Sequence, residues 1–323
     1  MAQREYGFDA VKGAAIILVV FGHVWLGLNG AGLIASPTLF QTVESAIYLF
    51  HMPVFFFVSG LFFSSRAAPG HFAWQKVQTL LWPLLLWSWI EGAALWISGQ
   101  GVDRGVVGPL DVLAYPVPVK SVFWFLWALF VLQVVAYVVQ RAAPAVSRVL
   151  LFALAVAAVS VFLLGLDPGR AVTIIENAPY FLIGVILAPM RASLTSRQVL
   201  PFVLALVLFG LAELLHFRDG NDARWFQLTA LVAVLGFVGA LARIGDSKTG
   251  RALAWLGQRT MPIYLVHIIL TAGTRAALLK LGGAEIWPHL VLGTLMGIVV
   301  PLALDAVLQR LRLGGLAGFG QRP

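Results

Sequence analysis

The sequence contains no cysteine among its 323 residues. This absence excludes disulfide bonds, thiolate nucleophiles, Cys-ligated zinc and iron–sulfur clusters. Charged residues are scarce, because Asp, Glu, Lys and Arg together make up only 11% of the chain, against about 25% in a soluble domain. The sequence also lacks a Gly-x-Ser-x-Gly elbow, an HExxH motif, a P-loop and a Rossmann fingerprint, which argues against soluble enzymes of those types.

Hydrophobic residues make up 60% of the chain and form several runs that approach the roughly 20 residues needed to cross a bilayer as helix. The runs are continuous and do not alternate, which argues against barrel strands. We therefore predict an all-α integral membrane protein, a bundle of about ten transmembrane helices that forms one membrane-embedded domain over residues 1–323. The predicted helices lie near 13–30, 43–63, 77–97, 121–140, 148–166, 172–190, 199–217, 225–242, 260–279 and 287–308.

The net charge of +8 follows a pattern typical of membrane topology. If the predicted helices alternate in direction, fifteen of the 22 Lys and Arg residues fall on the side of the N-terminus. The positive-inside rule then places both termini in the cytoplasm, in a multi-pass protein of a bacterial-type inner (plasma) membrane. No basic patch with interleaved aromatics stands out, so we expect membrane lipid as a partner and no nucleic acid. The first run has no small-x-small cleavage pattern, so we interpret it as a retained helix.

Glutamates mark the outer half of the predicted bundle. Glu44, Glu91, Glu176 and Glu213 fall within or at the edge of predicted helices, and on this topology all four lie toward the outside. A buried carboxylate there is costly unless it is paired, protonated or facing water. Each alone is compatible with an interfacial residue or a helix–helix hydrogen bond. Together they suggest a polar cavity open to the outside, with Glu91, Glu176 and Glu213 as substrate-binding candidates.

Histidines mark the predicted membrane interior. Lys12 and His23 are eleven residues apart, so on a helix they share nearly one face and are separated by a rise of roughly 16 Å. This places Lys12 at the cytoplasmic boundary and His23 near mid-depth, where a neutral imidazole can relay a proton or simply bond a neighbouring helix. His51 lies at a similar depth beside Pro53, which can kink the helix. Its structural and functional interpretations both stay open.

Several motifs follow one another in a recognisable order. Asp9-x-x-Lys12-Gly13 is followed by Phe21-Gly22-His23, which gives a basic residue, ten spacers and a histidine. Further segments are Phe50 to Gly60, Trp124-Phe125-Leu126 with Ala128-Leu129-Phe130, Pro179 to Gly184, and Gly257 to His267. In this series the chain resembles the membrane-bound acyltransferase-3 family, close to its fucose-O-acetylase-like branch.

The resemblance implies transfer of an acyl group, usually acetyl, from a cytoplasmic acyl-coenzyme A to a carbohydrate hydroxyl, without a metal. The acceptor in this interpretation is a glycan or a lipid-linked sugar. His23 would act as general base or carry the acyl group transiently, and Asp9 would pair with Lys12 or orient the helix start. The catalytic candidates are His23, Asp9 and His51, and the donor-binding candidates are Lys12, Lys76 and Arg66.

The sequence departs from the family pattern at two basic positions. The family often has Arg-x-x-Arg shortly before the proline of its third helix, whereas the residues before Pro83 are Lys76 and Thr79. Lys12 also stands where many members have arginine. Only one basic residue of the pair before Pro83 thus remains, and at Lys12 bidentate contact with a phosphate is lost because lysine is a point charge.

Two other functions stay open. A transporter or flippase for a lipid-linked sugar would need no coenzyme A, although the internal repeat common among transporters is missing. A membrane scaffold or sensor would have no need for polar groups at mid-depth, which are expensive there. Trp82 and Trp87 are interpreted as residues of the interfacial aromatic belts.

Overall fold

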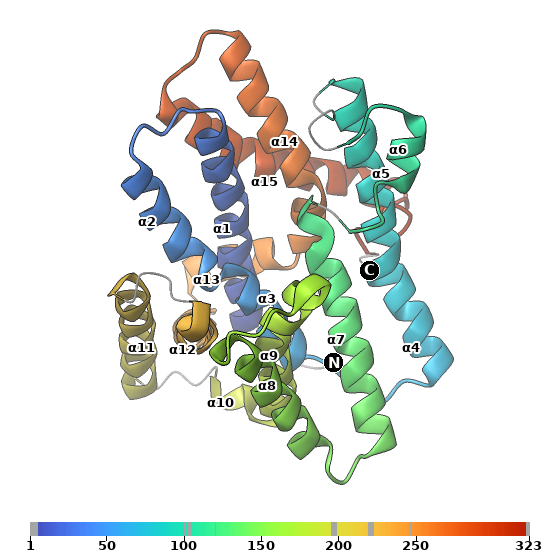
Figure 1. The fold of residues 1–323 in the computed structure, drawn as a ribbon, viewed down its shortest axis with the longest axis vertical. Coiled ribbons are helices and arrows are strands. Elements are labelled where there is room, and N and C mark those ends of the chain that lie inside the picture. The colour runs from blue at the N-terminus through green and yellow to red at the C-terminus, as the bar shows by residue number, and fades with distance from the viewer. Residues whose placement is uncertain are drawn as a thin grey trace. The chain divides into compact units, whose positions relative to one another are not determined.

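The computed structural model describes residues 6–99, 101, 105–119, 121–194, 199–218, 223–245 and 247–320. All regular structure in these ranges is helical, as Figure 1 shows. In chain order the elements are α1 (Tyr6–Gly30), α2 (Pro37–Tyr48), α3 (His51–Leu61), α4 (Pro69–Lys76), the π-helical turn η1 (Val77–Leu81), α5 (Trp82–Ile97), α6 (Pro109–Ala114), the short 3-10 helix η3 (Ser121–Phe123), α7 (Trp124–Ala142), α8 (Ser147–Leu163), η4 (Gly169–Ala171), α9 (Val172–Leu187), η5 (Ala188–Met190), α10 (Arg191–Leu194), α11 (Val199–Arg218), α12 (Ala223–Arg243), α13 (Lys248–Gly257), α14 (Thr260–Lys280) and α15 (Ile286–Arg310).

The predicted all-α membrane fold is confirmed. Within the described ranges, 8 helical spans are long and apolar enough to cross a membrane, and α8 is a shorter apolar helix. The spans are Tyr6–Gly30, Pro37–Leu61, Pro69–Ile97, Ser121–Ala142, Gly169–Leu194, Trp225–Arg243, Thr260–Lys280 and Ile286–Arg310. Each predicted helix corresponds to a helix of the structure, with α11 at the seventh position.

The boundaries and continuity of the first three predicted helices differ from expectation. The first begins at Tyr6 and the second at Pro37, where the Ser36 side chain accepts a hydrogen bond from the backbone N–H of Leu39 and caps the helix start. The second helix is broken after Tyr48 and resumes at His51. The third begins at Pro69 and contains the η1 π-turn, a feature that often marks functional sites.

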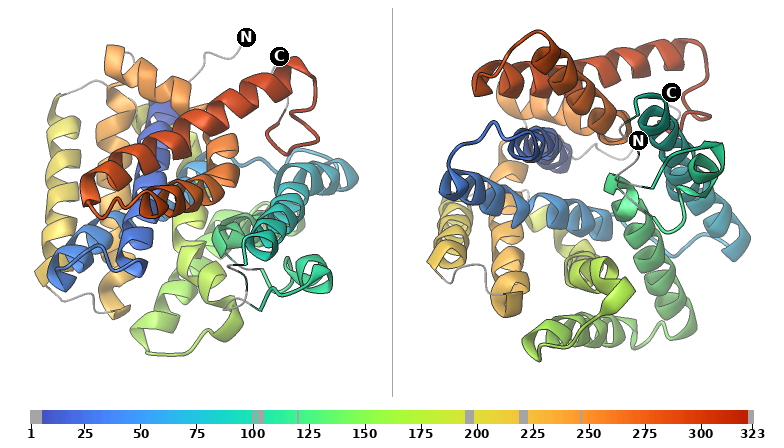
Figure 2. Two further views of the ribbon diagram at one scale, coloured as in Figure 1. Left: turned by 90° about the horizontal axis from the view of Figure 1, so that it is seen from above. Right: turned by 45° about the horizontal axis from the view of Figure 1, so that its top comes forward.

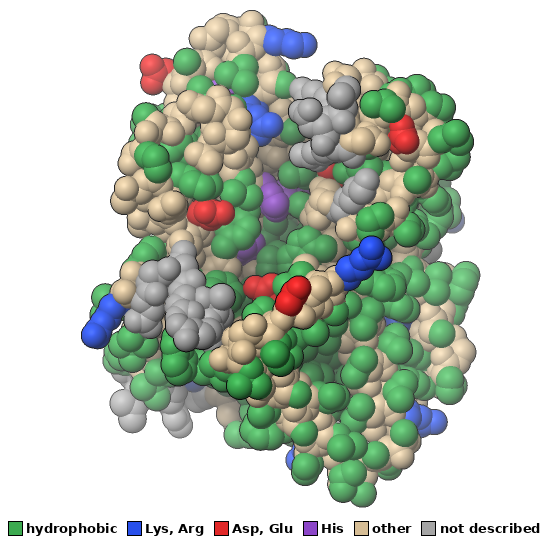
Figure 3. Space-filling model, viewed as in Figure 1, with side chains coloured by type: hydrophobic (Ala, Val, Ile, Leu, Met, Phe, Trp, Pro, Cys, Tyr) green, Lys and Arg blue, Asp and Glu red, His purple; other side chains and the backbone are tan. Residues whose placement is uncertain are grey.

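The surface is apolar, which the membrane assignment explains. In Figure 3 hydrophobic side chains are widespread on the face shown, and charged side chains are few. In water, contiguous apolar patches of this extent are rare, whereas lipid tails solvate such surfaces. Exposed examples from α8, α11 and α15 are Phe152, Leu154, Val156, Leu204, Val207, Leu211, Val291, Leu295 and Val299.

Packing divides the chain into two compact units, which we describe separately. The first comprises Met1–Ser65 and Leu132–Thr260, and the second Arg66–Val131 and Met261–Pro323. In the first unit, α1 packs on α3, α12 and α13, α3 packs on α9, and α11 lies along α12 (Figure 2). That the whole chain forms one membrane-embedded domain stays a prediction.

Glycines bring the helices of the first unit into close contact. A methyl group on Gly60 of α3 would overlap the Phe181 carbonyl oxygen of α9, and one on Gly184 would overlap the Phe57 carbonyl oxygen in return. The same relation holds between α1 and α13, where Gly257 lies against the Asp9 carbonyl. Small residues at helix crossings are typical of membrane proteins, because they let backbones approach.

The C-terminal residues fold back on α5 within the second unit (Figure 2). The Trp82 and Trp87 indole nitrogens donate hydrogen bonds to the carbonyl oxygens of Leu316 and Ala317, at 2.7 and 2.8 Å. The Phe319 ring stacks on Trp87 with centroids 5.7 Å apart. Trp87 is buried by this packing, and its interpretation as an interfacial-belt residue stays a prediction.

Candidate active site

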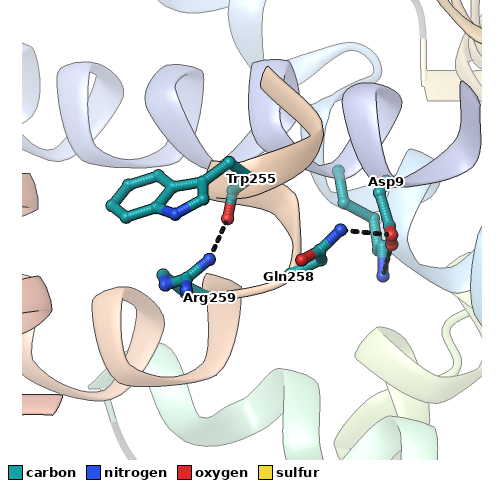
Figure 4. Close-up of polar contacts among 5 residues, drawn as sticks. Asp9, Trp255, Gln258 and Arg259 are labelled. Carbon is teal, nitrogen blue, oxygen red and sulfur yellow. Dashed lines mark hydrogen bonds and ion pairs between the residues drawn. The ribbon is translucent and has the colours of Figure 1, made fainter. Parts of the chain in front are cut away.

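Asp9 and Lys12 form an ion pair on the first turns of α1. The Lys12 ammonium lies 2.8 Å from Asp9 Oδ1, with about a third of the lysine side chain (29%) exposed. The other carboxylate oxygen, Oδ2, accepts a hydrogen bond of 3.1 Å from the Gln258 side chain, which follows α13 (Figure 4). Asp9 therefore fixes Lys12 and joins α1 to α13, while the partly exposed ammonium keeps further donor capacity.

The local sequence explains this arrangement. Gly13 and Gly257 allow α1 and α13 to touch, because a methyl group on Gly13 would overlap the Leu253 carbonyl oxygen. The chain turns after Gly257, and Arg259 donates a hydrogen bond of 2.9 Å to the Trp255 carbonyl while its guanidinium lies 4.1 Å from the centre of the Trp255 ring (Figure 4). Cationic groups from two segments thus lie at the same end of α1.

His23 lies further along the same unbroken helix. Since α1 runs from Tyr6 to Gly30 without interruption, the expected rise of roughly 16 Å between Lys12 and His23 holds. The His23 ring is half-buried and contacts the Tyr48 ring at the end of α2, with centroids 6.5 Å apart and planes at 79°. Tyr48 in turn meets His51 edge-to-face at 4.5 Å. The structure therefore brings both His23 and His51 into ring contact with one tyrosine.

The break between α2 and α3 places His51. Pro53 has no N–H to bond the Leu49 carbonyl, so the helix cannot continue regularly. The carbonyl oxygen of Ile47 accepts the Phe50 N–H at a long 3.4 Å and the His51 Nδ1 at 2.7 Å. Because a carbonyl only accepts, Nδ1 carries the proton, and Nε2 is the basic nitrogen of the neutral ring. His51 is 2% exposed, and this contact fixes both its tautomer and its orientation.

The other predicted donor-binding residues belong to the second unit. Lys76 ends α4, immediately before the η1 turn, and its ammonium lies 5.2 Å from the centre of the Phe72 ring. Thr79, at the second position of the family's basic pair, donates to the Gln75 carbonyl oxygen at 2.8 Å. Arg66 is exposed in the segment between α3 and α4. Lys76 and Arg66 are therefore near each other in sequence, whereas Lys12 belongs to the first unit.

Two of the three predicted substrate-binding acids lie in the first unit. Glu176, near the start of α9, is half-buried, and its backbone carbonyl accepts a 3.2 Å hydrogen bond from Gln227 of α12. Glu213 is half-buried on α11, and within the described residues neither of its carboxylate oxygens has a hydrogen-bond partner. One turn later on α11, His216 is buried against Phe226 of α12. Glu176 thus contacts α12 through its backbone, and Glu213 lies on α11 one turn before His216.

Glu91, the third predicted acid, is buried in the second unit, on α5. Its Oε1 accepts a 2.7 Å hydrogen bond from the Ser121 hydroxyl, and the residue is 4% exposed. Ser121 has a φ of 56°, which is unusual for a residue with a side chain. Tyr264 of α14 donates to the carbonyl oxygen of the next residue, Val122. Glu91 thus anchors the chain that leads into α7, and a role in binding substrate stays a prediction.

Sequence reasoning missed Tyr48 and Gln258. Tyr48 lies three residues before His51 and has no motif of its own, so only its contact with α1 shows its relevance. Gln258 directly follows Gly257 in a recognised segment, and that position was a usable signal. In the part of the chain that the structure describes, no group of three or more His, Asp or Glu side chains is placed to hold a metal ion.

The sequence of this chain matches a family profile and known proteins. The sequence profile of a family described as "Acyltransferase domain" matches residues 5–306. The nodulation protein NolL of Mesorhizobium japonicum is 24% identical over 191 residues, which are 57% of this chain and 48% of that protein. NolL of Sinorhizobium fredii is 34% identical over 134 residues, 39% of this chain and 34% of that protein. The matches thus span about half or less of these relatives' lengths. No solved structure matches the chain.

Proposed function

Since this chain belongs to the acyltransferase family matched above, we propose that it is a membrane O-acyltransferase whose donor is a cytoplasmic acyl-coenzyme A, in the first place acetyl-CoA. The acceptor is a hydroxyl of a carbohydrate, either a glycan or a lipid-linked sugar. The protein is a multi-pass membrane protein, and the bacterial origin of its relatives supports a bacterial inner membrane.

One observation carries the proposal: a single helix, α1, presents Lys12 in its N-terminal half and His23 in its C-terminal half. Acyl transfer from a thioester needs a cation for the donor's phosphates and a base for the acceptor's hydroxyl. Lys12 supplies the first and His23 the second, separated by roughly 16 Å. An extended donor such as acyl-CoA can bridge a separation of this size.

The reaction conserves atoms and charge with these groups alone. The acceptor oxygen attacks the thioester carbonyl carbon, and His23 takes the hydroxyl proton as the new C–O bond forms. The C–S bond then breaks, and the imidazolium returns the proton to the sulfur to give the free thiol. His51, whose Nε2 is basic in the tautomer fixed by Ile47, assists His23 as a second proton acceptor in this transfer. The alternative, a transient acyl group on His23, reaches the same products in two steps.

The donor's phosphates are assigned to Lys12, Lys76 and Arg66. Asp9 holds the Lys12 ammonium in place through the 2.8 Å ion pair. The acceptor is assigned to the polar groups of the predicted outer half, Glu91, Glu176 and Glu213. Carboxylates are suitable there because each accepts hydrogen bonds from sugar hydroxyls. The relatives are nodulation proteins, and the resemblance to the fucose-O-acetylase-like branch favours a sugar acceptor.

Binding of acetyl-CoA to the purified protein tests the donor assignment without knowledge of the acceptor. In calorimetry the wild type should bind acetyl-CoA saturably. Lys12→Ala and Lys76→Ala should each weaken binding about tenfold or more, because a hydrogen bond to a charged group contributes about 1.5–3 kcal/mol. Lys12→Arg should retain binding.

Lys280→Ala is the matched control, because Lys280 is an exposed lysine and the last residue of α14. Its affinity for acetyl-CoA should equal that of the wild type. Folded wild-type protein that binds neither acetyl-CoA nor a longer acyl-CoA would contradict the proposal and favour the transporter.

A further inference from the structure

We propose that the Tyr48 hydroxyl is a catalytic hydrogen-bond donor that polarises the thioester carbonyl during acyl transfer. This inference rests on the proposed function and adds a residue that the sequence analysis did not select. Acyl transfer builds negative charge on the carbonyl oxygen, and a fixed donor aimed at that oxygen stabilises the transition state. Among the described residues, Tyr48 carries such a donor and contacts both candidate histidines.

Tyr48 lies beside both candidate histidines. Tyr48 is the last residue of α2, directly before the helix break, and its ring contacts both His23 and His51. The two ring contacts are close to perpendicular, at 79° and 78°. If His23 is the base, the reacting carbonyl comes close to its ring, and Tyr48 is a neighbour of that ring.

The burial of the Tyr48 hydroxyl also points to a role in function. Within the described residues, the Tyr48 oxygen is buried and has no hydrogen-bond partner. A buried hydroxyl without a partner costs about 1–3 kcal/mol, so such groups are rare unless a ligand or water satisfies them. Phenylalanine would make the same ring contacts without this cost. The hydroxyl is therefore explained by a partner that arrives during function.

Gly22, which precedes His23, lets the Tyr48 ring approach α1. A methyl group on Gly22 would lie 3.2 Å from Tyr48 Cε2 and 3.6 Å from the hydroxyl oxygen. The phenol ring thus occupies the space left by the missing side chain, and its oxygen lies against the backbone of α1 next to His23. Gly22 explains how a large ring approaches the histidine so closely.

In the reaction, Tyr48 keeps its proton. Its O–H donates a hydrogen bond to the thioester carbonyl oxygen, which becomes negatively charged as the acceptor oxygen attacks the carbon. His23 takes the acceptor's proton and passes it to the departing sulfur. As the C–S bond breaks, the carbonyl is restored and the hydrogen bond weakens, so no net proton transfer involves the tyrosine.

Tyr48→Phe tests the inference, because it removes only the oxygen. Loss of one such donor typically lowers kcat about 10²- to 10³-fold, so we expect that decrease, with a smaller loss of affinity for acetyl-CoA in calorimetry because the ground-state hydrogen bond is lost as well. Infrared difference spectra with acetyl-CoA isotope-labelled at the carbonyl provide a second measurement. The bound carbonyl band should lie at lower frequency than in solution for the wild type and return toward the solution value in Tyr48→Phe. A merely structural role would not move this band.

Tyr137→Phe is the control, since it removes the hydroxyl of a buried tyrosine on α7 and should leave kcat and the carbonyl band unchanged. Full kcat in Tyr48→Phe, or the same carbonyl frequency in Tyr48→Phe and wild type, would overturn the inference while leaving the proposed function intact. If the wild type itself binds no acyl-CoA and transfers no acyl group, the proposed function fails first.

Discussion

At the scale of single residues, His51 combines two properties that substitution can separate. Its Nδ1–H satisfies the Ile47 carbonyl at the break between α2 and α3, and its Nε2 is the basic nitrogen beside Tyr48. The first property concerns the stability of the fold and the second the chemistry. An asparagine can reproduce the first, because its amide N–H₂ lies near the position of Nδ1, but it has no basic nitrogen.

We therefore expect His51→Ala to lower the free energy of unfolding by about 1–3 kcal/mol, because it leaves a buried carbonyl poorly satisfied. His51→Asn should recover most of that stability. Thermal unfolding in detergent measures both variants, and acyl transfer measured alongside shows whether Nε2 is needed. Equal stability of the Ala variant and the wild type would contradict the structural role of the imidazole.

Residue positions within one helix were predictable, whereas contacts between helices were not. The helical period alone gives the separation of Lys12 and His23, and α1 confirms it. The contact of His23 with Tyr48 depends on how α2 crosses α1, and no local pattern reports a crossing. The ion pair between Asp9 and Lys12 was among the alternatives because it is an i, i+3 contact. The Gln258 bond, from a residue far along the chain, was not.

At the scale of elements, helix packing explains the glycines in two of the segments that resemble the acyltransferase-3 family. Phe50 to Gly60 and Pro179 to Gly184 meet where Gly60 and Gly184 cross, in α3 and α9. The glycines permit backbone contact, and this contact holds α3, whose first residue is His51. The glycines of a family motif can thus mark a helix crossing that positions a reactive group such as His51, without themselves taking part in the chemistry.

Gly60→Ala should destabilise the protein by about 1–3 kcal/mol or more, because the added methyl group overlaps the Phe181 carbonyl oxygen, and overpacking of a tight contact costs this much. Gly210→Ala is the matched control: this helical glycine of α11 is exposed and would meet nothing within 4 Å. Alanine there should be neutral or stabilise by up to about 1 kcal/mol. Comparable melting temperatures for the two variants would argue against the crossing.

Element boundaries show where sequence patterns end. Hydrophobic runs located the transmembrane spans, but α13 lies in a predicted connection, because it is a short helix with Lys248 and Arg251 among its residues. The break within the second span follows from Pro53, whose kinking effect was expected. Trp87 illustrates a contact that no local pattern reports, because it packs on Phe319, whose position depends on the folding back of the C-terminal segment.

At the scale of the whole molecule, the predicted orientation follows from the distribution of Lys and Arg, and the absence of cysteine makes it directly testable. Ala31→Cys, between α1 and α2, should react with a membrane-impermeant maleimide added outside intact cells. Gly70→Cys, in the first turn of α4, should react only after the membrane is opened. Both sites are exposed. Labelling in the opposite pattern would reverse the topology and move Lys12 to the outer side, away from cytoplasmic acyl-CoA.

The proposed acyl transfer depends on His23, and one measurement tests this dependence most directly. Membranes from cells that produce the wild type or His23→Gln are incubated with radiolabelled acetyl-CoA, and base-labile label is measured in the carbohydrate fraction. We expect label from the wild type and none above the vector control from His23→Gln, with equal amounts of folded protein. Equal labelling by the two proteins would contradict the assignment of His23.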